Sequence, residues 1–129
     1  MMGHLIARVL CVGDDPAIRE HLAHQLRRFG IQPVLVSAGI DALCIAKTEE
    51  VDVCVINSRM PDMNGEKLAR ELRRVAPQIP LVMTSADGRA RHAVSKLVDR
   101  FVAKDAGYER ALVSEVFSLL GGRSRAVSG

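Results

Sequence analysis

Chemically active side chains follow the short apolar segments of this chain, at the points where those segments end. They are two acids, an amide, a hydroxyl and an amine: Asp14, Asp15, Asn57, Ser85 and Lys104. If the segments are parallel strands of one sheet, their carboxyl ends share an edge, and these groups gather in a single crevice. Such a set of groups can hold an ion and position a reacting group. The rest of the sequence must then supply the strands and helices that place them there.

Five short segments rich in Val, Ile and Leu predict five strands. They lie at residues 5–12, 33–37, 51–56, 81–84 and 101–103. The segments lack strict alternation of polar and apolar residues, which is typical of strands covered by helices on both faces. Between them, apolar residues recur at helical spacing at 18–29, 40–46, 68–75 and 112–120, and a further helix is expected within 89–97. This alternation predicts an α/β fold with a doubly wound parallel sheet.

Length and composition indicate one domain. The chain has 129 residues, of which 48% are hydrophobic and 3% aromatic, so its core must be aliphatic. We expect the domain to span residues 5–120 and the segment 121–129, rich in Gly and Ser, to be a flexible tail or linker stub. The net charge of +3 is weak evidence for a nucleic-acid or membrane partner, and no apolar run approaches the ~18 residues of a membrane span.

The cysteines indicate the compartment. Cys11, Cys44 and Cys54 lie within apolar segments and form no Cys-x-x-Cys pair. Their odd number and apolar neighbours favour buried free thiols over disulfides. This predicts a reducing, cytoplasmic location.

Four short motifs occur one after another along the chain. They are residues 13–19, residues 57–65, the pair Ser85-Ala86, and Lys104 three residues after Phe101. The Met-Pro-x-Met-x-Gly element at 60–65 has a distinctive spacing, and the four motifs in this order resemble response-regulator receiver domains over almost the whole chain. The resemblance implies a flavodoxin-like (βα)5 fold, with a five-stranded parallel sheet in the order 2-1-3-4-5. It also implies a role in two-component, phosphorelay signal transduction.

The resemblance further implies a site. In that family, two acids after the first strand and an Asp ending the third bind a divalent ion, and this Asp accepts a phosphoryl group from a partner kinase. The two acid positions here hold Gly13 and Asp14, with Asp15 beside them, and the acceptor position holds Asn57. The amide nitrogen shares its lone pair with the carbonyl, and the amide oxygen is neutral. Asn57 is therefore not expected to form the acyl phosphate that a carboxylate forms.

The missing acids change the charge of this pocket. An intact pocket has three carboxylates and one Lys, whereas Asp14 and Lys104 alone leave a formal charge of zero. Divalent cations select sites by their charged oxygens, so we expect Mg²⁺ binding to be lost or very weak, with Asp14 as the residual ligand candidate. Lys104 is then expected to hydrogen-bond to Asn57 or to pair with Asp14. The degenerate pocket should comprise Gly13, Asp14, Asp15, Asn57, Arg59, Ser85 and Lys104.

Ser85 and Phe101 match the hydroxyl and the switch aromatic that, in the family, act together when phosphorylation changes the surface of the last helix. Here we expect both to be fixed in one state. Ser85 and Lys104 are nineteen residues apart, fewer than is usual, so the helix within 89–97 is expected to be short or displaced. Asp105 stands where the family has a Pro in a cis bond, and we expect a trans bond.

Some residues have simpler interpretations. Asn57 at a strand end could merely cap the next loop, and an engineered change of Asp to Asn would silence a receiver without explaining Gly13. His21 and His24 lack a third ligand and are expected to be solvated. The basic residues between 89 and 100 have no interleaved aromatic residues of the kind that stack on bases, so a nucleic-acid partner is not expected.

The sequence thus predicts a receiver-like domain that is not an enzyme, needs no cofactor, is not phosphorylated and acts through protein–protein interaction. The partner is expected to be a kinase, phosphotransfer or output protein, bound through the fourth helix, fifth strand and fifth helix. The wide apolar stripe at 112–120 also suggests a homodimer surface. Two alternatives stay open: a working phosphorelay receiver that uses another acceptor or deamidates Asn57, and a small-molecule module on the same fold, although no Gly-rich nucleotide motif follows a strand.

Overall fold

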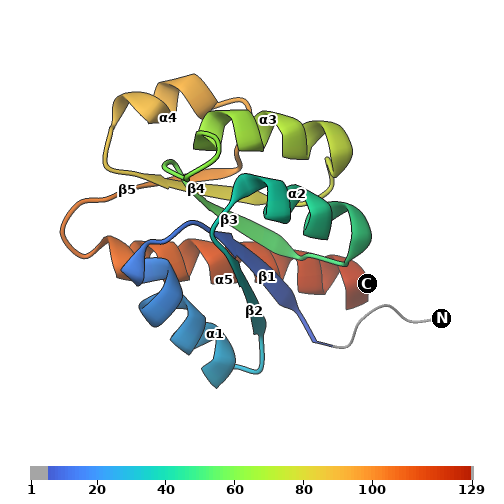
Figure 1. Cartoon of the computed structure of the whole chain (residues 1–129). Coiled ribbons are helices and arrows are strands. Elements are labelled where there is room, and N and C mark those ends of the chain that lie inside the picture. Colours follow the sequence, from blue (N-terminus) through green and yellow to red (C-terminus); the bar gives the residue numbers. More distant parts are fainter. Residues whose placement is uncertain (1–5, 129) are drawn as a thin grey trace.

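Five parallel strands form one sheet, covered by helices on both faces (Figure 1). The computed structural model describes residues 6–128, without the side chains of 122–128. The strands are β1 (Arg8–Val12), β2 (Gln32–Val36), β3 (Val53–Asn57), β4 (Leu81–Ser85) and β5 (Arg100–Ala103). They lie in the order β2-β1-β3-β4-β5, which confirms the predicted fold and strand order.

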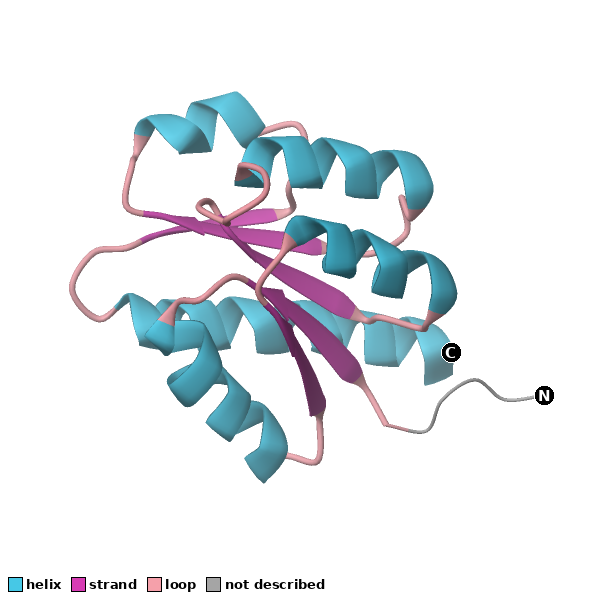
Figure 2. Ribbon diagram, in the orientation of Figure 1, coloured by secondary structure: helices cyan, strands magenta, loops and turns pink. Residues whose placement is uncertain are grey.

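Helices connect successive strands and form two layers (Figure 2). The first helical segment begins as η1 (Ala17–Leu22), which has π-helical hydrogen bonding, and continues directly as α1 (Ala23–Arg28). The others are α2 (Gly39–Thr48), α3 (Gly65–Val75), α4 (Arg89–Val94) and α5 (Tyr108–Ser128). α2, α3 and α4 cover one face of the sheet, and η1, α1 and α5 cover the other.

Each face of the sheet buries its own apolar core. On β3, Cys54 and Ile56 belong to the core beneath α2 and α3, while Val53 and Val55 belong to the core beneath α1 and α5. Every residue of β3 is buried. Because both faces of the strand need apolar side chains, the sequence shows no polar alternation there.

The last helix is longer than the sequence predicted. α5 continues through residues 121–128, the segment expected to be a flexible tail, and Gly129 lies outside the described residues. Leu112 and Val116 anchor the helix in the core. Extending an existing helix needs no new nucleation, so the anchored turns carry it past two glycines. Leu5, the expected first residue of the domain, also lies outside the described residues, and no helix among those described is long and apolar enough to cross a bilayer.

Two of the three cysteines are buried, as expected. Burial raises the pKa of the Cys11 thiol to about 12 and raises that of Cys54 as well. Cys44 is exposed, so the prediction that it is buried was wrong. The reason is that α2 turns Ala42, Leu43 and Ala46 toward the sheet, which leaves Cys44 on its outer side.

An arginine fixes the connection from the short α4 to β5. α4 has only six residues, as the reduced spacing predicted. Arg73 of α3 donates to the carbonyls of Leu97 at 2.6 Å and Ile79 at 3.0 Å. The Nη2 of Arg73 lies 2.6 Å from the carboxylate of Asp99, which also accepts a hydrogen bond from the backbone N–H of Leu81. We call Arg73 and these partners the Arg73 cluster, and it joins α3, β4 and the segment before β5.

Candidate functional site

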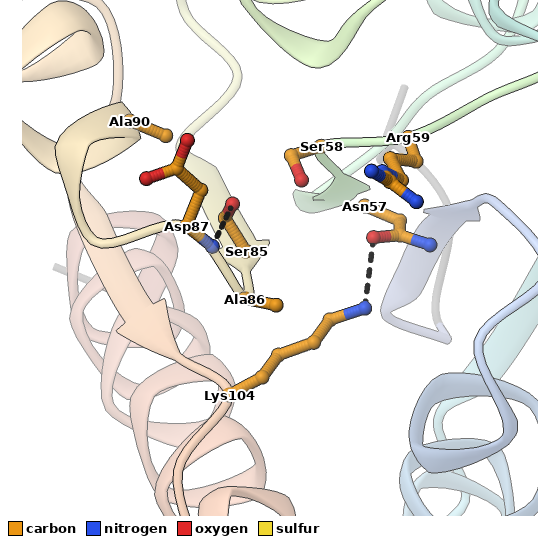
Figure 3. A pocket seen from close by; sticks show the side chains of 8 residues that line it. All are labelled: Asn57, Ser58, Arg59, Ser85, Ala86, Asp87, Ala90 and Lys104. Atoms are coloured by element: carbon orange, nitrogen blue, oxygen red, sulfur yellow. Dashed lines mark hydrogen bonds between the residues drawn. The ribbon is translucent and has the colours of Figure 1, made fainter.

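The ends of β3 and β4 and the loop after β5 line an open pocket of about 770 Å³ at one edge of the sheet (Figure 3). The lining residues are Asn57, Ser58, Arg59, Ser85, Ala86, Asp87, Ala90 and Lys104. Four of the expected pocket residues therefore meet in it, as the shared edge of parallel strands requires.

Lys104 binds the amide that stands at the acceptor position. Its Nζ donates to Asn57 Oδ1 at 3.0 Å, which is one of the two contacts expected (Figure 3). The same ammonium lies 2.7 Å from Asp15 Oδ2. Lys104 thus links the end of β3 to the loop after β1.

Asp15 is a buried carboxylate that accepts hydrogen bonds from several directions. Besides Lys104, its donors are the backbone N–H of Ala17 at 2.9 Å and the Tyr108 hydroxyl, which lies 2.9 and 3.1 Å from the two carboxylate oxygens. Burial opposes ionisation of Asp15, but these hydrogen bonds outweigh it and hold its pKa below the usual value. Burial and the contact with Asp15 raise the pKa of Tyr108 to about 12. We call Asp15, Asn57, Lys104 and Tyr108 the Lys104 cluster.

Asp14 points away from the pocket. Its side chain is 75% exposed and forms an ion pair with Arg19. The expected pairing of Lys104 with Asp14 is therefore wrong, and Asp15 takes that place. The cause is local: Asp15 accepts the N–H of Ala17 at the start of η1, which fixes Asp15 inward and leaves Asp14 on the outside of the turn.

Gly13 and Asn57 are in close contact. Gly13 has a φ of +120°, a conformation that other residues rarely adopt. A Cβ at this position would lie 2.5 Å from the Cβ of Asn57 and 3.2 Å from its amide nitrogen. The first acid position of the family therefore has no room for a side chain on this backbone.

The residues around Lys104 do not suit Mg²⁺, which needs several free carboxylate or carbonyl oxygens. The Asn57 oxygen accepts a hydrogen bond from Lys104. The Asp15 carboxylate is in contact with Lys104, Tyr108 and a backbone N–H. The Asp14 carboxylate faces solvent. Within the described part of the chain, no three His, Cys, Asp or Glu side chains gather in a way that could hold a metal ion.

The two expected switch residues are each held by a neighbour. Ser85 is buried, and its Oγ accepts the backbone N–H of Asp87 at 3.0 Å (Figure 3). The guanidinium carbon of Arg91, in α4, lies 4.7 Å from the centre of the half-buried Phe101 ring, a cation–π contact. The peptide bond from Lys104 to Asp105 is trans, as expected.

The model of the response regulator receiver domain family matches residues 9–116 of this chain. The chain belongs to this family. The match begins at the second residue of β1 and ends within α5, so it includes the other four strands and every residue of the pocket.

Curated relatives of this receiver domain are longer proteins. The transcriptional regulatory protein GlrR of Escherichia coli is 30% identical over 115 residues, and the response regulator MprA of Mycobacterium leprae is 32% identical over 100 residues. These alignments cover 84% and 78% of this chain but only 26% and 41% of the two relatives. The chain thus spans less than half the length of either relative.

Solved receiver domains have the same fold. A CheY-like receiver domain protein from Methanospirillum hungatei superposes with a TM-score of 0.80 at 18% identity, covering 94% of this chain and 98% of that one. TrrA from Thermotoga maritima, solved in complex with Mg²⁺ and BeF, superposes with a TM-score of 0.76 at 26% identity, covering 88% and 99%. The first similarity bears on the fold alone.

Sequence reasoning missed Tyr108, the member of the Lys104 cluster that donates to Asp15. It is the single Tyr of the chain, at the first residue of α5, four residues after Lys104. A hydroxyl only four residues from Lys104 in the sequence was the signal that could have placed Tyr108 near this lysine. Its direction depends on the turn at Gly107, whose φ is +78°.

Proposed function

We propose that this receiver domain is not phosphorylated and acts through protein–protein interaction in two-component signalling. In this proposal it is a cytoplasmic module without enzymatic activity, and it works without bound Mg²⁺. The observation that carries the proposal is the hydrogen bond from Lys104 to Asn57. It places a neutral amide beside the pocket lysine, at the position where the family has the acceptor carboxylate.

The chemistry of residue 57 supports the first part. Acyl phosphate formation needs a carboxylate oxygen as nucleophile, and a metal ion to offset the charge of the incoming phosphoryl group. Asn57 offers only a neutral amide oxygen, and that oxygen accepts a hydrogen bond from Lys104. Asp15, the carboxylate in contact with Lys104, is balanced by that same ammonium, so the pair leaves no net negative charge to attract a metal ion. We therefore expect Mg²⁺ affinity to be negligible.

The alternative of activation by deamidation is not favoured. Deamidation of Asn57 would require the backbone nitrogen of Ser58 to attack the side-chain amide. That nitrogen donates to the carbonyl of Thr84 at 2.9 Å, between neighbouring strand ends. A nitrogen held in this way is poorly placed for attack.

The surface formed by α4, β5 and α5 is the proposed site for the protein partner, whether a kinase, a phosphotransfer protein or an output protein. It carries exposed basic residues: Arg89, Arg91, His92, Lys96 and Arg100. Asp87 and Glu115 offset Arg89 and Arg100, which leaves the others to favour an acidic partner. Arg91 also contacts the ring of Phe101, which joins the α4 part of this surface to β5.

A homodimer is a second possible use of this domain's surface. Phe29 is 66% exposed, and its ring meets the ring of Phe117 edge-on at 5.4 Å. Sedimentation of the protein beside its Phe29→Ser variant tests this use. A dimer that the substitution dissociates supports it, and a monomeric parent protein rules it out.

Phosphorylation is tested directly by incubation with acetyl phosphate and Mg²⁺, followed by intact mass measurement. We expect no added phosphoryl mass, while a receiver with Asp at the acceptor position, treated alongside, gains it. The Asn57→Asp variant is the matched control, and we expect it to label poorly because Gly13 and Asp14 supply no further inward carboxylate. Added mass on the parent protein, mapped to Asp14, Asp15 or Ser58, would overturn the proposal.

A further inference from the structure

Among the residues that the structure describes, the pocket beside Asn57 contains one cation with no counterpart. Lys104 is paired with Asp15, and Asp87 is paired with Arg89. The side chain of Arg59, which lines the same pocket, makes no hydrogen bond or ion pair within the described part of the chain. The pocket therefore carries a net positive charge on its β3 side.

Hydrogen-bond donors accompany this charge. The oxygen of the Asn57 amide is used by Lys104, while its Nδ2 has no acceptor within the described part of the chain. Ser85 Oγ accepts the N–H of Asp87, so its own hydrogen remains available to a ligand. Ser58 adds a second hydroxyl between Asn57 and Ser85 (Figure 3). Donors and positive charge together, with no unpaired acid, are the chemistry of an anion site.

We propose that this pocket binds the phosphate group of a small organic phosphate, non-covalently and without a metal. The proposal goes beyond the interaction role and rests on it in one respect, namely that residue 57 stays an unmodified amide. Arg59 supplies a planar, permanently charged group that can donate two parallel hydrogen bonds to phosphate oxygens. Asn57, Ser58 and Ser85 supply the neutral donors. A carboxylate at position 57 would repel the same anion, so the substitution that removes the acceptor is also what permits binding.

The size and the far wall of the pocket indicate an organic ligand. At about 770 Å³ the pocket is within the range of small-molecule sites and much larger than a phosphate ion needs. Ala86 and Ala90 form an apolar part of its lining. Asp87, on the β4 side, offers carboxylate oxygens to hydroxyl groups (Figure 3). A phosphate at Arg59 joined to a hydroxylated body near Asp87 fits this distribution, as in a sugar phosphate.

The experiment is calorimetric titration of the full chain with ribose 5-phosphate, inorganic phosphate and ribose, in buffer containing EDTA. We expect ribose 5-phosphate to bind most tightly, inorganic phosphate more weakly, and ribose not measurably. Backbone amide signals of Ser58, Arg59 and Ala86 should shift on titration. Absence of binding by both phosphates overturns the proposal, and equal affinity for the two overturns its organic part.

Matched variants localise the site. Arg59→Gln should weaken ribose 5-phosphate binding by about tenfold or more, the worth of a charge-assisted hydrogen bond. Arg28→Gln removes an exposed charge from the end of α1, far from the pocket, and should leave affinity unchanged. Asn57→Asp should abolish binding. If both arginine variants lost the same affinity for ribose 5-phosphate, the effect would come from the net charge of the protein. That result would overturn the assignment of the site to this pocket. Because binding is read without Mg²⁺ and phosphorylation by covalent mass, the failure of one proposal is distinguishable from the failure of the other.

Discussion

Arg73 and Lys104 each tie distant elements together, but they bond to different kinds of partner. Arg73 donates mainly to backbone carbonyls, at Leu97, Pro77 and Ile79, and to one carboxylate. Within residues 6–128, Lys104 donates through Nζ to side chains alone, those of Asn57 and Asp15. A cluster built on carbonyls depends on the path of the chain, whereas one built on side chains depends on the identity of those residues. The comparison shows that in the Lys104 cluster the groups that stabilise the fold are the ones that could otherwise do chemistry.

Truncation of Arg73 should have the largest effect on stability. Arg73→Ala removes charged donors from several carbonyls and from Asp99, and should lower the free energy of unfolding by about 3 kcal/mol. Arg74→Ala is the control, because Arg74 is exposed and pairs only with Glu71, and it should cost less than about 0.5 kcal/mol. Urea unfolding of the two variants measures both. Equal losses would mean that the Arg73 cluster does not hold α3 to the α4–β5 connection.

Filling position 13 should have the next largest effect. Gly13→Ala places a Cβ against Asn57 in a left-handed backbone and should cost about 2 kcal/mol. Gly30→Ala shares the positive φ but meets no atom within 4 Å, and should cost about 1 kcal/mol. Thermal unfolding of the two variants separates the collision from the backbone strain. A Gly13→Ala variant no less stable than Gly30→Ala would show that the β1 loop moves freely away from Asn57.

The two neighbouring acids should differ in a smaller but diagnostic way. Asp15→Asn removes the charge that faces Lys104 and should cost between about 1 and 2 kcal/mol. Asp14→Asn, which loses only an exposed pair with Arg19, should be nearly neutral. The reverse order in urea unfolding would place Asp14, and not Asp15, in the Lys104 cluster.

The same pair of variants predicts an acid dependence. The folded-state pKa of Asp15 is depressed, so its stabilisation is present above the unfolded pKa of about 4 and is lost as the pH falls through the folded value. Unfolding measured from pH 6 downward should therefore show a shallower loss of stability in Asp15→Asn than in Asp14→Asn. Parallel curves would contradict the assignment.

The fold was predictable because it depends on the order of apolar and polar residues along the chain. The fully buried β3, with cores on both sides, forces an apolar run that the sequence displays directly. The contact of Lys104 with Asn57 was predictable for a similar reason, since strand ends in a parallel sheet converge whatever the loops do.

The choice between Asp14 and Asp15 was not predictable, because both acids occupy one turn. Their directions follow from the φ of Gly13 and from the N–H groups at the start of η1, which the residue types alone do not specify. Tyr108 depends in the same way on the turn at Gly107. Cys44 was misplaced because an apolar stretch does not reveal which side of α2 faces the sheet.

The close approach of Gly13 to Asn57 makes the side chains allowed at these two positions depend on each other. Changing residue 57 to Asp alone is sterically free, since Asp and Asn have the same shape, and it adds an acid beside Asp15 while position 13 still carries none. Giving position 13 a side chain would introduce a collision, because its new Cβ meets the Cβ that every non-glycine residue carries at position 57. On this backbone, a side chain at position 13 therefore requires the loop after β1 and the end of β3 to move apart.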